Sequence, residues 1–430
     1  MDPQATQLNE RIRQQNPNVL ELLSEKGKNI FFPKLGILSQ SAQAKGKKIN
    51  ATIGEAIEDD GLSMHLSGFD DLIKMPLASV YPYAPSFGKL DLRKAWKNNI
   101  IHKNPSLVNT LFSTPIATCG LTHGVSMAGY MFVDEGDTVV IPDLFWENYS
   151  LIFENACRGK VETFPLFKNG RFNTEGFSAK LNSIEKKIIL LLNFPNNPTG
   201  YTPLTDEIDG IVNAITEQAE KGKKVVVLID DAYFGLVYEE KVFKESIFTR
   251  LVSADENLLA VKLDGATKED YVWGFRVGFI SYGVKNGTAE LYEALENKTA
   301  GAIRANISNI SNLTQSLLQK VYTSESYSHD KVNKFNTLKG RYLEIRKTLS
   351  NSKYSEYFEA LPFNSGYFMC IRVKNGLNAE EIRKILLDKY DTGVIVFGDI
   401  IRLAFSAVPQ SKIASLIENI YLACKDYSSK

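Results

Sequence analysis

The middle of the chain alternates short apolar runs with a segment of helical periodicity. Residues 186–193 (KKIILLLN) and 223–230 (KKVVVLID) are nearly continuous aliphatic runs, which is typical of strands buried on both faces of a parallel sheet. Between them, residues 205–221 place apolar side chains at helical spacing, and Gly222 follows where such a helix would end. This pattern predicts a β-α-β unit.

Further apolar runs extend the same arrangement. Residues 138–142, 257–263 and 277–282 are predicted to be additional strands of the sheet, with helices between them. Strands that alternate with helices favour an α/β fold, here from about residue 70 to residue 310.

The C-terminal part has a different pattern. Short strands are predicted at 365–372, 393–397 and 401–406, followed by an amphipathic last helix, so a smaller α+β domain is expected there. Residues 290–326 have no strand pattern and are expected to form a long helix that connects the domains.

Composition narrows the class of function. The chain has 430 residues, 44% of them hydrophobic, which suffices for a large core and more than one domain. Its 50 Lys and Arg balance its 50 Asp and Glu, so we expect no nucleic-acid or membrane partner. The four cysteines lie far apart, and the polar N-terminus resembles no signal peptide. We therefore expect a cytoplasmic protein without a metal site that acts on small molecules.

Polar residues follow two of the predicted strands, where open α/β sheets bind ligands. The loop NFPNNPTG at 193–200 is stiffened by prolines, with a cis peptide expected before one of them, and can aim the Asn197 amide at a ligand oxygen. The segment DDAY at 230–233 places Asp230 at the end of an apolar strand, where a carboxylate requires a cation or a donor. The alternatives are an ordinary turn for the first segment and a solvated or helix-capping carboxylate for the second.

Two further segments supply cations and a helix start. Lys268 offers an amine that can form a Schiff base, and the planar guanidinium of Arg276 suits a phosphate. Residues 120–126 open an apolar helix whose first N–H groups favour an anion near His123. The alternatives are a surface lysine with a structural arginine, and a packed loop histidine.

These segments together offer an amine for an aldehyde, a carboxylate for a ring cation, an amide and a hydroxyl for a ring oxygen, and an arginine for a phosphate. Those are the requirements of pyridoxal 5′-phosphate (PLP). The order of NPTG at 197–200, DDAY at 230–233, and Lys268 followed by RVG at 276–278 resembles the fold type I, class I/II aminotransferases over nearly the whole chain.

The resemblance implies a fold, a cofactor and residue roles. It implies a large PLP-binding domain at 66–310 with a mainly parallel sheet flanked by helices, and a smaller α+β domain built from both chain ends, 1–65 and 311–430. Lys268 would form the Schiff base with PLP and move a proton, and Asp230 would pair with the pyridine nitrogen. Tyr233, counted with them as catalytic, would hydrogen-bond the ring hydroxyl oxygen. The other cofactor contacts that it implies are Asn197, Arg276, Trp146, Thr267, His123, Gly124, Val125 and Tyr83.

The resemblance also implies a substrate site and a partner. Arg402, in the strand-like segment 401–406, would clamp the substrate α-carboxylate, assisted by Asn197 and Gly54. Tyr83 would reach the phosphate in a neighbouring subunit, which implies a homodimer with shared active sites. Arg304 is a candidate ligand for a distal carboxylate in that other subunit, and a salt-bridged helix arginine is the alternative.

Two segments depart from the family pattern. The stretch Gly265-Ala266-Thr267-Lys268 stands where the family often has Ser-x-Ser-Lys, so Thr267 is left as the only phosphate-binding hydroxyl there. Residues 269–273 (EDYVW) are bulkier and more acidic than the Gly-rich stretch usual in the family, and are expected to reshape the entrance of the site.

The expected activity is that of a PLP-dependent transaminase in amino-acid metabolism. An amino group would pass between an L-amino acid and a 2-oxo acid by a ping-pong mechanism, with glutamate or aspartate as a candidate dicarboxylate in one half-reaction. A β-lyase or decarboxylase of the same fold is the alternative, because the motifs bind cofactor and carboxylate without selecting the bond that breaks. A transcription regulator is disfavoured, because residues 1–49 are too few for a winged-helix domain.

Overall fold

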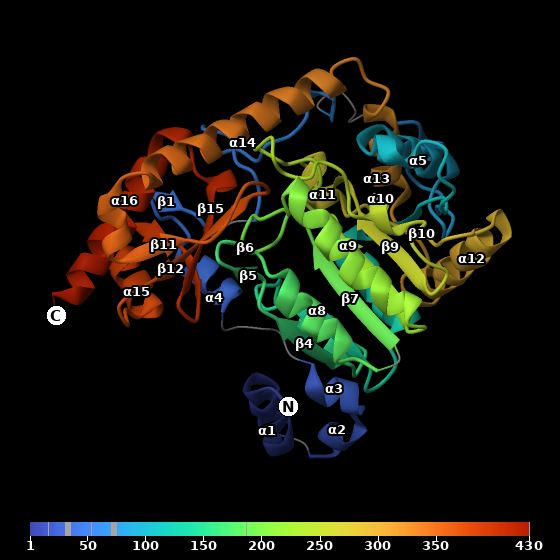
Figure 1. Cartoon of the computed structure of the whole chain (residues 1–430), viewed down its shortest axis with the longest axis horizontal. Coiled ribbons are helices and arrows are strands. Elements are labelled where there is room, and N and C mark those ends of the chain that lie inside the picture. The colour runs from blue at the N-terminus through green and yellow to red at the C-terminus, as the bar shows by residue number, and fades with distance from the viewer. Residues whose placement is uncertain (16, 31–35, 53, 70–74, 186, 430) are drawn as a thin grey trace.

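A seven-stranded sheet lies at the centre of the computed structural model, which describes residues 1–15, 17–30, 36–52, 54–69, 75–185 and 187–429 (Figure 1). The order is β2-β10-β9-β8-β7-β3-β4; β10 is antiparallel to both neighbours, and the strands from β9 to β4 run parallel. The strand bounds are β2 Ile116–Thr118, β3 Thr138–Pro142, β4 Lys160–Phe164, β7 Lys187–Asn193, β8 Lys224–Asp230, β9 Leu258–Asp264 and β10 Gly278–Gly283.

Helices cover both faces of this sheet because its central strands are apolar on both sides. In β7, Ile188, Leu190 and Leu192 face one core, and Ile189 and Leu191 face the other. Helices α8 and α9 cover the first face, in front of β7 in Figure 1, whereas α6 packs on the second face against β8, β9 and β10. The β-α-β unit predicted around α9 is confirmed; the predicted first strand residue, Lys186, lies outside the described residues.

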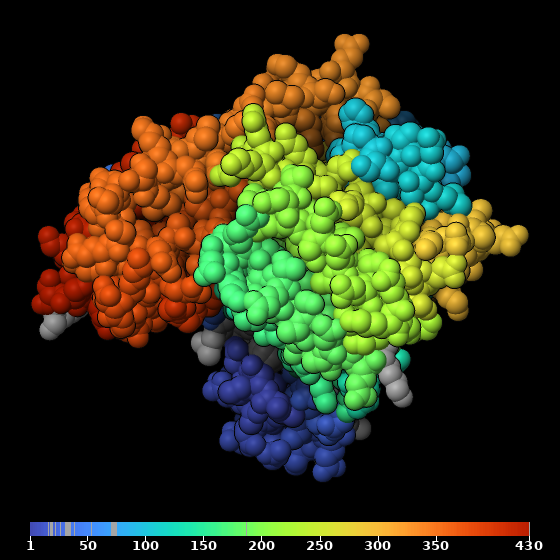
Figure 2. Space-filling model, in the orientation of Figure 1, coloured from blue at the N-terminus to red at the C-terminus, as the bar shows by residue number. Residues whose placement is uncertain are grey.

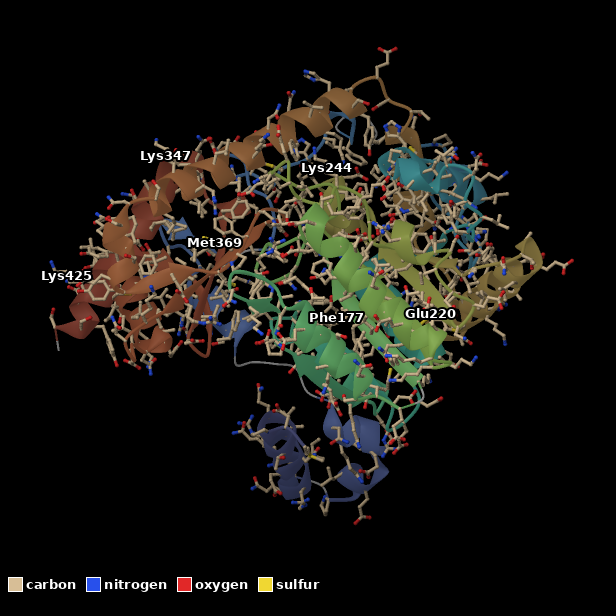
Figure 3. The ribbon with its side chains drawn as sticks, viewed as in Figure 1. Phe177, Glu220, Lys244, Lys347, Met369 and Lys425 are labelled. Carbon is tan, nitrogen blue, oxygen red and sulfur yellow. The ribbon has the colours of Figure 1, made fainter. Side chains whose placement is uncertain are left out.

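The second part is a four-stranded antiparallel sheet in the order β11-β12-β15-β14. Its strands are β11 Phe358–Ala360, β12 Phe368–Val373, β14 Ile395–Phe397 and β15 Ile400–Ala404. Phe177 of α8 and Met369 of β12, both fully buried, mark the cores of the two parts in Figure 3. Two small ribbons complete the strands: β1 Ile49–Asn50 with β13 Thr392–Gly393, and β5 Phe167–Lys168 with β6 Arg171–Phe172.

The helices vary widely in length. The longer ones are α1 Pro3–Gln15, α5 Leu90–Lys103, α6 Gly120–Phe132, α8 Thr174–Asn182, α9 Thr205–Glu220, α12 Ala289–Asn306, α13 Asn312–Val321, α14 Tyr327–Leu349, α15 Ala379–Lys389 and α16 Gln410–Ser428. The shorter ones are α2 Pro17–Leu22, α3 Glu25–Asn29, α4 Ile37–Gln43, α7 Asn148–Ser150, α10 Phe248–Leu251 and α11 Ala266–Glu269. Within the described ranges, no helix is both long and apolar enough to span a membrane.

The prediction of one connecting helix over 290–326 is wrong. Helix α12 ends at Asn306, Ser308 takes a left-handed conformation with φ 65°, and Ser311 caps the separate helix α13 by accepting a hydrogen bond from the backbone N–H of Thr314. The long connection is instead α14, which runs from the large sheet to the small one (Figure 1).

The N-terminal residues divide between two places. Helix α4 packs beside β13 and β14, and the Gln40 side chain exchanges two hydrogen bonds with the backbone of Val396, so this segment joins the C-terminal part. Helices α1, α2 and α3 form a separate lobe, dark blue in Figure 2, that contacts the π-helical turn Leu151–Ala156.

Candidate active site

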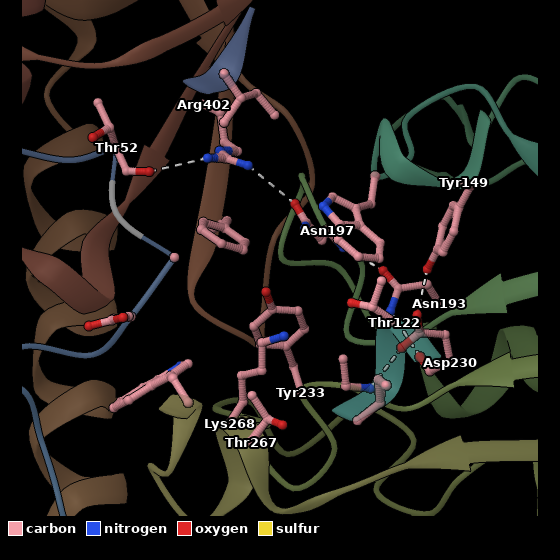
Figure 4. A pocket seen from close by; sticks show the side chains of 18 of the residues that line it. Thr52, Thr122, Tyr149, Asn193, Asn197, Asp230, Tyr233, Thr267, Lys268 and Arg402 are labelled. Carbon is pink, nitrogen blue, oxygen red and sulfur yellow. Dashed lines mark hydrogen bonds between the residues drawn. The ribbon is translucent and has the colours of Figure 1, made fainter. Parts of the chain in front are cut away.

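A cavity of about 450 Å³ lies beside the carboxyl ends of β7, β8 and β9 (Figure 4). This is the edge at which open α/β sheets bind ligands. It is closed on its other side by Phe368 and Arg402 of the small sheet and by Thr52 of the N-terminal segment. The predicted site residues that line it are Lys268, Asp230, Tyr233, Asn197, Arg276, Trp146, Thr267, Arg402 and Gly54.

Asp230, the last residue of β8, presents its carboxylate to this cavity. Its Oδ2 accepts a 2.6 Å hydrogen bond from the Tyr149 hydroxyl, and its Oδ1 accepts the backbone N–H of Ala232 at 3.0 Å. Burial raises the pKa of Asp230, while Tyr149 and the nearby Lys268 amine act in the opposite direction. Among the described residues, the effect of burial on this carboxylate thus exceeds the opposing effects of its donors and of the Lys268 amine.

Asp231 has a different role, because successive residues of a strand point to opposite sides. Its carboxylate is buried in the core, where it accepts hydrogen bonds from Lys262 and from the Ser246 hydroxyl. Asp230 is thus the acid of the DDAY segment that faces the cavity, and the solvated alternative does not hold for either residue, since both are buried.

Lys268 lies on the short helix α11, directly after β9, and its amine points into the cavity (Figure 4). The amine lies 5.1 Å from the centre of the Tyr233 ring, and the Tyr367 hydroxyl donates to the Lys268 carbonyl at 3.1 Å. Burial lowers the pKa of Lys268, and Arg276 lowers it further, against the opposing effect of Asp230. The alternative of a surface lysine is therefore excluded.

Donors without acceptors gather at the start of α6. The Thr267 hydroxyl is buried and has no hydrogen-bond partner among the described residues. Arg276 donates to the Trp273 carbonyl at 3.1 Å and makes no ion pair within the described ranges. Gly120, at φ +73°, lets the arginine approach, because a Cβ there would lie 2.3 Å from its Nη2. A guanidinium, a hydroxyl and a helix N-terminus together suit a phosphate.

His123, Gly124 and Val125, which were predicted to contact the phosphate, are not among the residues that line the cavity. Helix α6 begins at Gly120, so these residues fall beyond its first N–H groups. The Nδ1 of His123 accepts the backbone N–H of Cys119 at 3.0 Å, Gly124 packs near Leu263, and Val125 is fully buried. The residues of this turn that line the cavity are Leu121 and Thr122.

Arg402 is a buried cation whose hydrogen bonds are weak. Nη1 lies 3.4 Å from the Asn197 amide oxygen and Nη2 lies 3.3 Å from the Thr52 carbonyl, while Nε has no partner among the residues that the structure describes. The guanidinium stacks 4.6 Å from the centre of the Phe368 ring, and no carboxylate of the described residues pairs with it. A buried guanidinium without an anion is costly, so this group is available to bind a carboxylate. Ile53, between Thr52 and the predicted Gly54, lies outside the described residues.

Tyr83 and Arg304 do not reach this cavity. They line a separate surface cavity together with Ser86, Ser308 and Asn309, and the Tyr83 side chain is 90% exposed. Arg304 is exposed near the end of α12 and makes no ion pair within the described part of the chain, so the salt-bridge alternative is not supported.

Sequence reasoning missed three residues that shape the site. Tyr149 bonds Asp230 from 81 positions away, and a tyrosine in a short helix gives no signal of such a contact. Asn193 donates to the Asp230 carbonyl at 2.8 Å and accepts the backbone N–H of Asn197 at 2.7 Å, as its place at the end of a predicted strand could have indicated. Thr52 binds Arg402 through its backbone carbonyl, which any residue type can provide.

Comparisons with known proteins agree with this geometry. The family model described as aminotransferase class I and II matches residues 82–420. A probable aspartate aminotransferase of Methanocaldococcus jannaschii is 25% identical over 199 residues, which is 46% of this chain and 48% of that protein. An aspartate aminotransferase of Sulfolobus acidocaldarius is 29% identical over 171 residues, 38% of this chain and 39% of that protein. The chain thus spans about half the length of these curated relatives, or less.

Solved structures extend the match to most of the chain. An aminotransferase of Anaerococcus prevotii superposes with a TM-score of 0.83 at 25% identity, covering 93% of this chain and 98% of that one. A kynurenine aminotransferase of Pyrococcus horikoshii shares the fold, with a TM-score of 0.78 at 15% identity, covering 95% of this chain and 98% of that one. The chain belongs to the aminotransferase class I and II family, whose members use pyridoxal phosphate.

Proposed function

We propose that this chain is a PLP-dependent aminotransferase that moves an amino group between an L-amino acid and a 2-oxo acid. The observation that carries the proposal is one cavity that combines the Lys268 amine, the buried Asp230 carboxylate and the Arg402 guanidinium, which pairs with no anion in the described ranges. When bound, PLP supplies an aldehyde for the amine and a ring that withdraws electrons from the substrate α-carbon.

The unpaired donors of the cavity fit this cofactor. Thr267, whose buried hydroxyl lacks an acceptor, and Arg276 would hold the phosphate at the start of α6. Asp230 would accept a hydrogen bond from the protonated ring nitrogen, and that cation would offset the burial that raises the pKa of Asp230. Asn197 and Tyr233 would contact the ring hydroxyl, and Trp146 would pack on the ring.

The Lys268 amine would have two roles. Because burial lowers its pKa, more of this amine is uncharged near neutral pH than for an exposed lysine, and both carbonyl attack and proton removal require the uncharged form. Lys268 would hold the cofactor through its amine, and the same amine would be placed to move a proton at the substrate α-carbon. Asp230, held by Tyr149, would remain ionised throughout.

Arg402 would bind the substrate α-carboxylate in both half-reactions. Its weak bonds to Asn197 and Thr52 would be replaced or supplemented by bonds to a carboxylate, and the Gly54 backbone lies at the same wall. Since one anchor and one lysine would serve both half-reactions, we expect ping-pong kinetics.

The choice between transamination and lyase chemistry requires a product assay. We would incubate the purified, PLP-loaded protein with single amino acids, with and without 2-oxoglutarate. Production of glutamate that depends on the acceptor supports the proposal. Release of pyruvate and ammonia without an acceptor would instead support a β-lyase, and release of carbon dioxide a decarboxylase.

We further propose a homodimer with shared active sites. Tyr83 and Arg304 lie together on the surface, where a second subunit could receive them, and Arg304 would then face a distal carboxylate such as that of glutamate or aspartate. Mixing the variants Tyr83→Ala and Lys268→Ala tests this proposal. If subunits exchange randomly, intact sites form in mixed dimers and about a quarter of the wild-type activity returns; no recovery in mixed dimers contradicts the proposal.

We also propose that the two sheets belong to separate units, with residues 66–310 as the large one and the chain ends, 1–65 and 311–430, as the small one. The pairing of β1 with β13 and the bonds between Gln40 and Val396 support this division.

A further inference from the structure

The acidic segment after Lys268 does not lie at the entrance of the cavity. Glu269 and Asp270 are 4% and 1% exposed, and neither lines the cavity, whereas Trp273 does. The expectation that residues 269–273 reshape the entrance therefore does not hold for the two acids, whereas Trp273 of the same stretch lines the cavity. Both carboxylates instead form ion pairs with lysines of neighbouring helices, Glu269 with Lys103 of α5 and Asp270 with Lys331 of α14.

Asp270 is held by three donors. Its Oδ1 accepts hydrogen bonds of 2.9 Å from both the Lys331 amine and the Tyr327 hydroxyl, and its Oδ2 accepts one of 2.8 Å from the Tyr322 hydroxyl. The Lys331 amine also donates to the backbone carbonyl of Glu269. We call these four residues, Asp270, Lys331, Tyr322 and Tyr327, the Asp270 anchor.

Two members of the anchor lie in the first two turns of α14. Ten residues further along this helix, or about 15 Å, the buried Arg341 donates to the backbone carbonyls of Ser406 and Ile57. Ser406 lies in the 3-10 turn Phe405–Ala407, which directly follows β15, the strand that carries Arg402. Helix α14 therefore contacts the Lys268 segment near one end and the Arg402 strand further along (Figure 1).

We propose that Asp270 is a positioning residue, which ties the segment bearing Lys268 to α14 and so sets the placement of the lysine amine relative to Arg402. The inference deepens the proposed function and rests on it, because it concerns the distance between the group that would move the proton and the group that would hold the substrate. Asp270 itself touches neither cofactor nor substrate site.

The contacts explain why a loss of the anchor would loosen this segment without unfolding the chain. In Asp270→Asn the amide keeps one acceptor oxygen, so at least one of the three donors loses its partner and the negative charge is gone. The Lys331 side chain is 28% exposed and can turn to water when its anion is removed. The backbone bonds that hold the Lys268 turn, Asp270 N–H to Ala266 and Val272 N–H to Thr267, remain but are no longer supported from α14.

Amide hydrogen exchange and kinetics test the inference together. In D270N we expect faster exchange of the amides at 270 and 272, in both the PLP-loaded and the PLP-free protein, because local opening becomes easier. We also expect kcat to fall roughly ten- to a hundredfold, as for a misplaced reacting group, with a much smaller change in KM because Arg402 is intact. The matched control is Glu344→Gln, which removes a 3.5 Å pair between the half-buried Glu344 and the exposed Lys347 on the same helix and should change neither quantity.

Two further variants extend the test, and the first of them keeps the inference testable if D270N does not fold. Tyr327→Phe removes one donor and keeps the ring, so we expect the same changes at smaller size. In the D270N background, Lys331→Gln replaces a cation that has lost its anion by a neutral amide that can hydrogen-bond the new asparagine. This second change should recover part of kcat. Unchanged exchange at 270 and 272 in D270N or Y327F overturns the inference, as does faster exchange with unchanged kcat. A wild-type protein without transaminase activity would instead overturn the proposed function, while the exchange data would still report on the anchor.

Discussion

The Tyr149 hydroxyl donates a 2.6 Å hydrogen bond to Oδ2 of Asp230, and both side chains are buried. Tyr149 comes from the short helix after β3, and Asp230 is the last residue of β8. The hydrogen bond therefore joins the segments that follow two different strands of the sheet, at the edge where the cavity lies. It favours the ionised form of a carboxylate whose burial raises its pKa. This form is the one that a cationic ring nitrogen requires.

Tyr149→Phe should therefore weaken cofactor binding. The variant keeps the ring and removes a hydrogen bond to a charged group, so the pKa of Asp230 should rise further and the dissociation constant for PLP should increase roughly tenfold. Absorbance titration of the cofactor-free protein measures this constant. Tyr130→Phe, at a tyrosine that is 70% exposed, is the control; equal PLP affinity in both variants would count against the assigned role of Asp230.

Arg402→Met should separate activity from stability. The substrate would lose its carboxylate partner, so kcat/KM should fall at least about a hundredfold. The free energy of unfolding should stay the same or rise, because no described carboxylate forms an ion pair with this buried cation and Glu147 attracts it from a greater distance. Arg372→Met on the neighbouring strand, where an exposed arginine pairs with Asp399 at 3.2 Å, is the matched control for both measurements. If Arg402→Met were strongly destabilised but had normal kinetics, Arg402 would be a residue that stabilises the fold and not one that binds the substrate.

Gly265→Ser should destabilise the protein although the family often has serine there. A Cβ at this position would lie 2.6 Å from the Gly278 Cα and 2.8 Å from the Val277 carbonyl oxygen. Such overpacking costs about 1–3 kcal/mol of the free energy of unfolding, which urea denaturation measures. Gly274→Ser is the control, because a Cβ there meets nothing within 4 Å. Equal stability of the two variants would show that the backbone at Gly265 can move away from the backbone at Val277 and Gly278 at little cost.

The close approach at Gly265 also illustrates what the sequence could and could not predict. Aliphatic runs predicted β3, β7, β8, β9 and β10, and hence the edge at which Lys268, Asp230 and Asn197 meet, because burial on both faces leaves a strong local signal. The segment at 120–126 predicted a helix start and the resemblance implied cofactor contacts there, but neither showed which of its residues face the cavity. That depends on where the helix begins, and it begins at Gly120.

Long-range contacts left no such signal. The bond between Tyr149 and Asp230, and the contacts of Asp270 with α14, join residues that are more than fifty positions apart, so no spacing rule identifies them. The break at Ser308 was missed because a single left-handed serine does not disturb a helical composition. The acidic character of residues 269 and 270 was visible, but its direction, into the core, was not.

Asp230 should make the stability of the cofactor-free protein depend on pH. Its pKa is raised in the folded state by burial, so the stability it contributes is fully present below its unfolded pKa of about 3.9 and is lost as pH rises through the folded pKa. The free energy of unfolding of the wild type relative to Asp230→Asn should therefore fall as pH rises above about 4, then level off. Urea unfolding at a series of pH values measures the difference. Parallel curves for the two proteins would show that this carboxylate does not titrate as the structure implies.

The most direct test of the whole account is the identity of the lysine that binds the cofactor. The purified protein, loaded with PLP, should be yellow, and reduction with borohydride should fix the cofactor to the chain. Peptide mapping should then place the label on Lys268, and Lys268→Ala should carry none. A protein that stays colourless with PLP, or a label on Lys262 or any other lysine, would contradict the central claim that the cavity at the carboxyl ends of β7, β8 and β9 is a PLP-dependent active site.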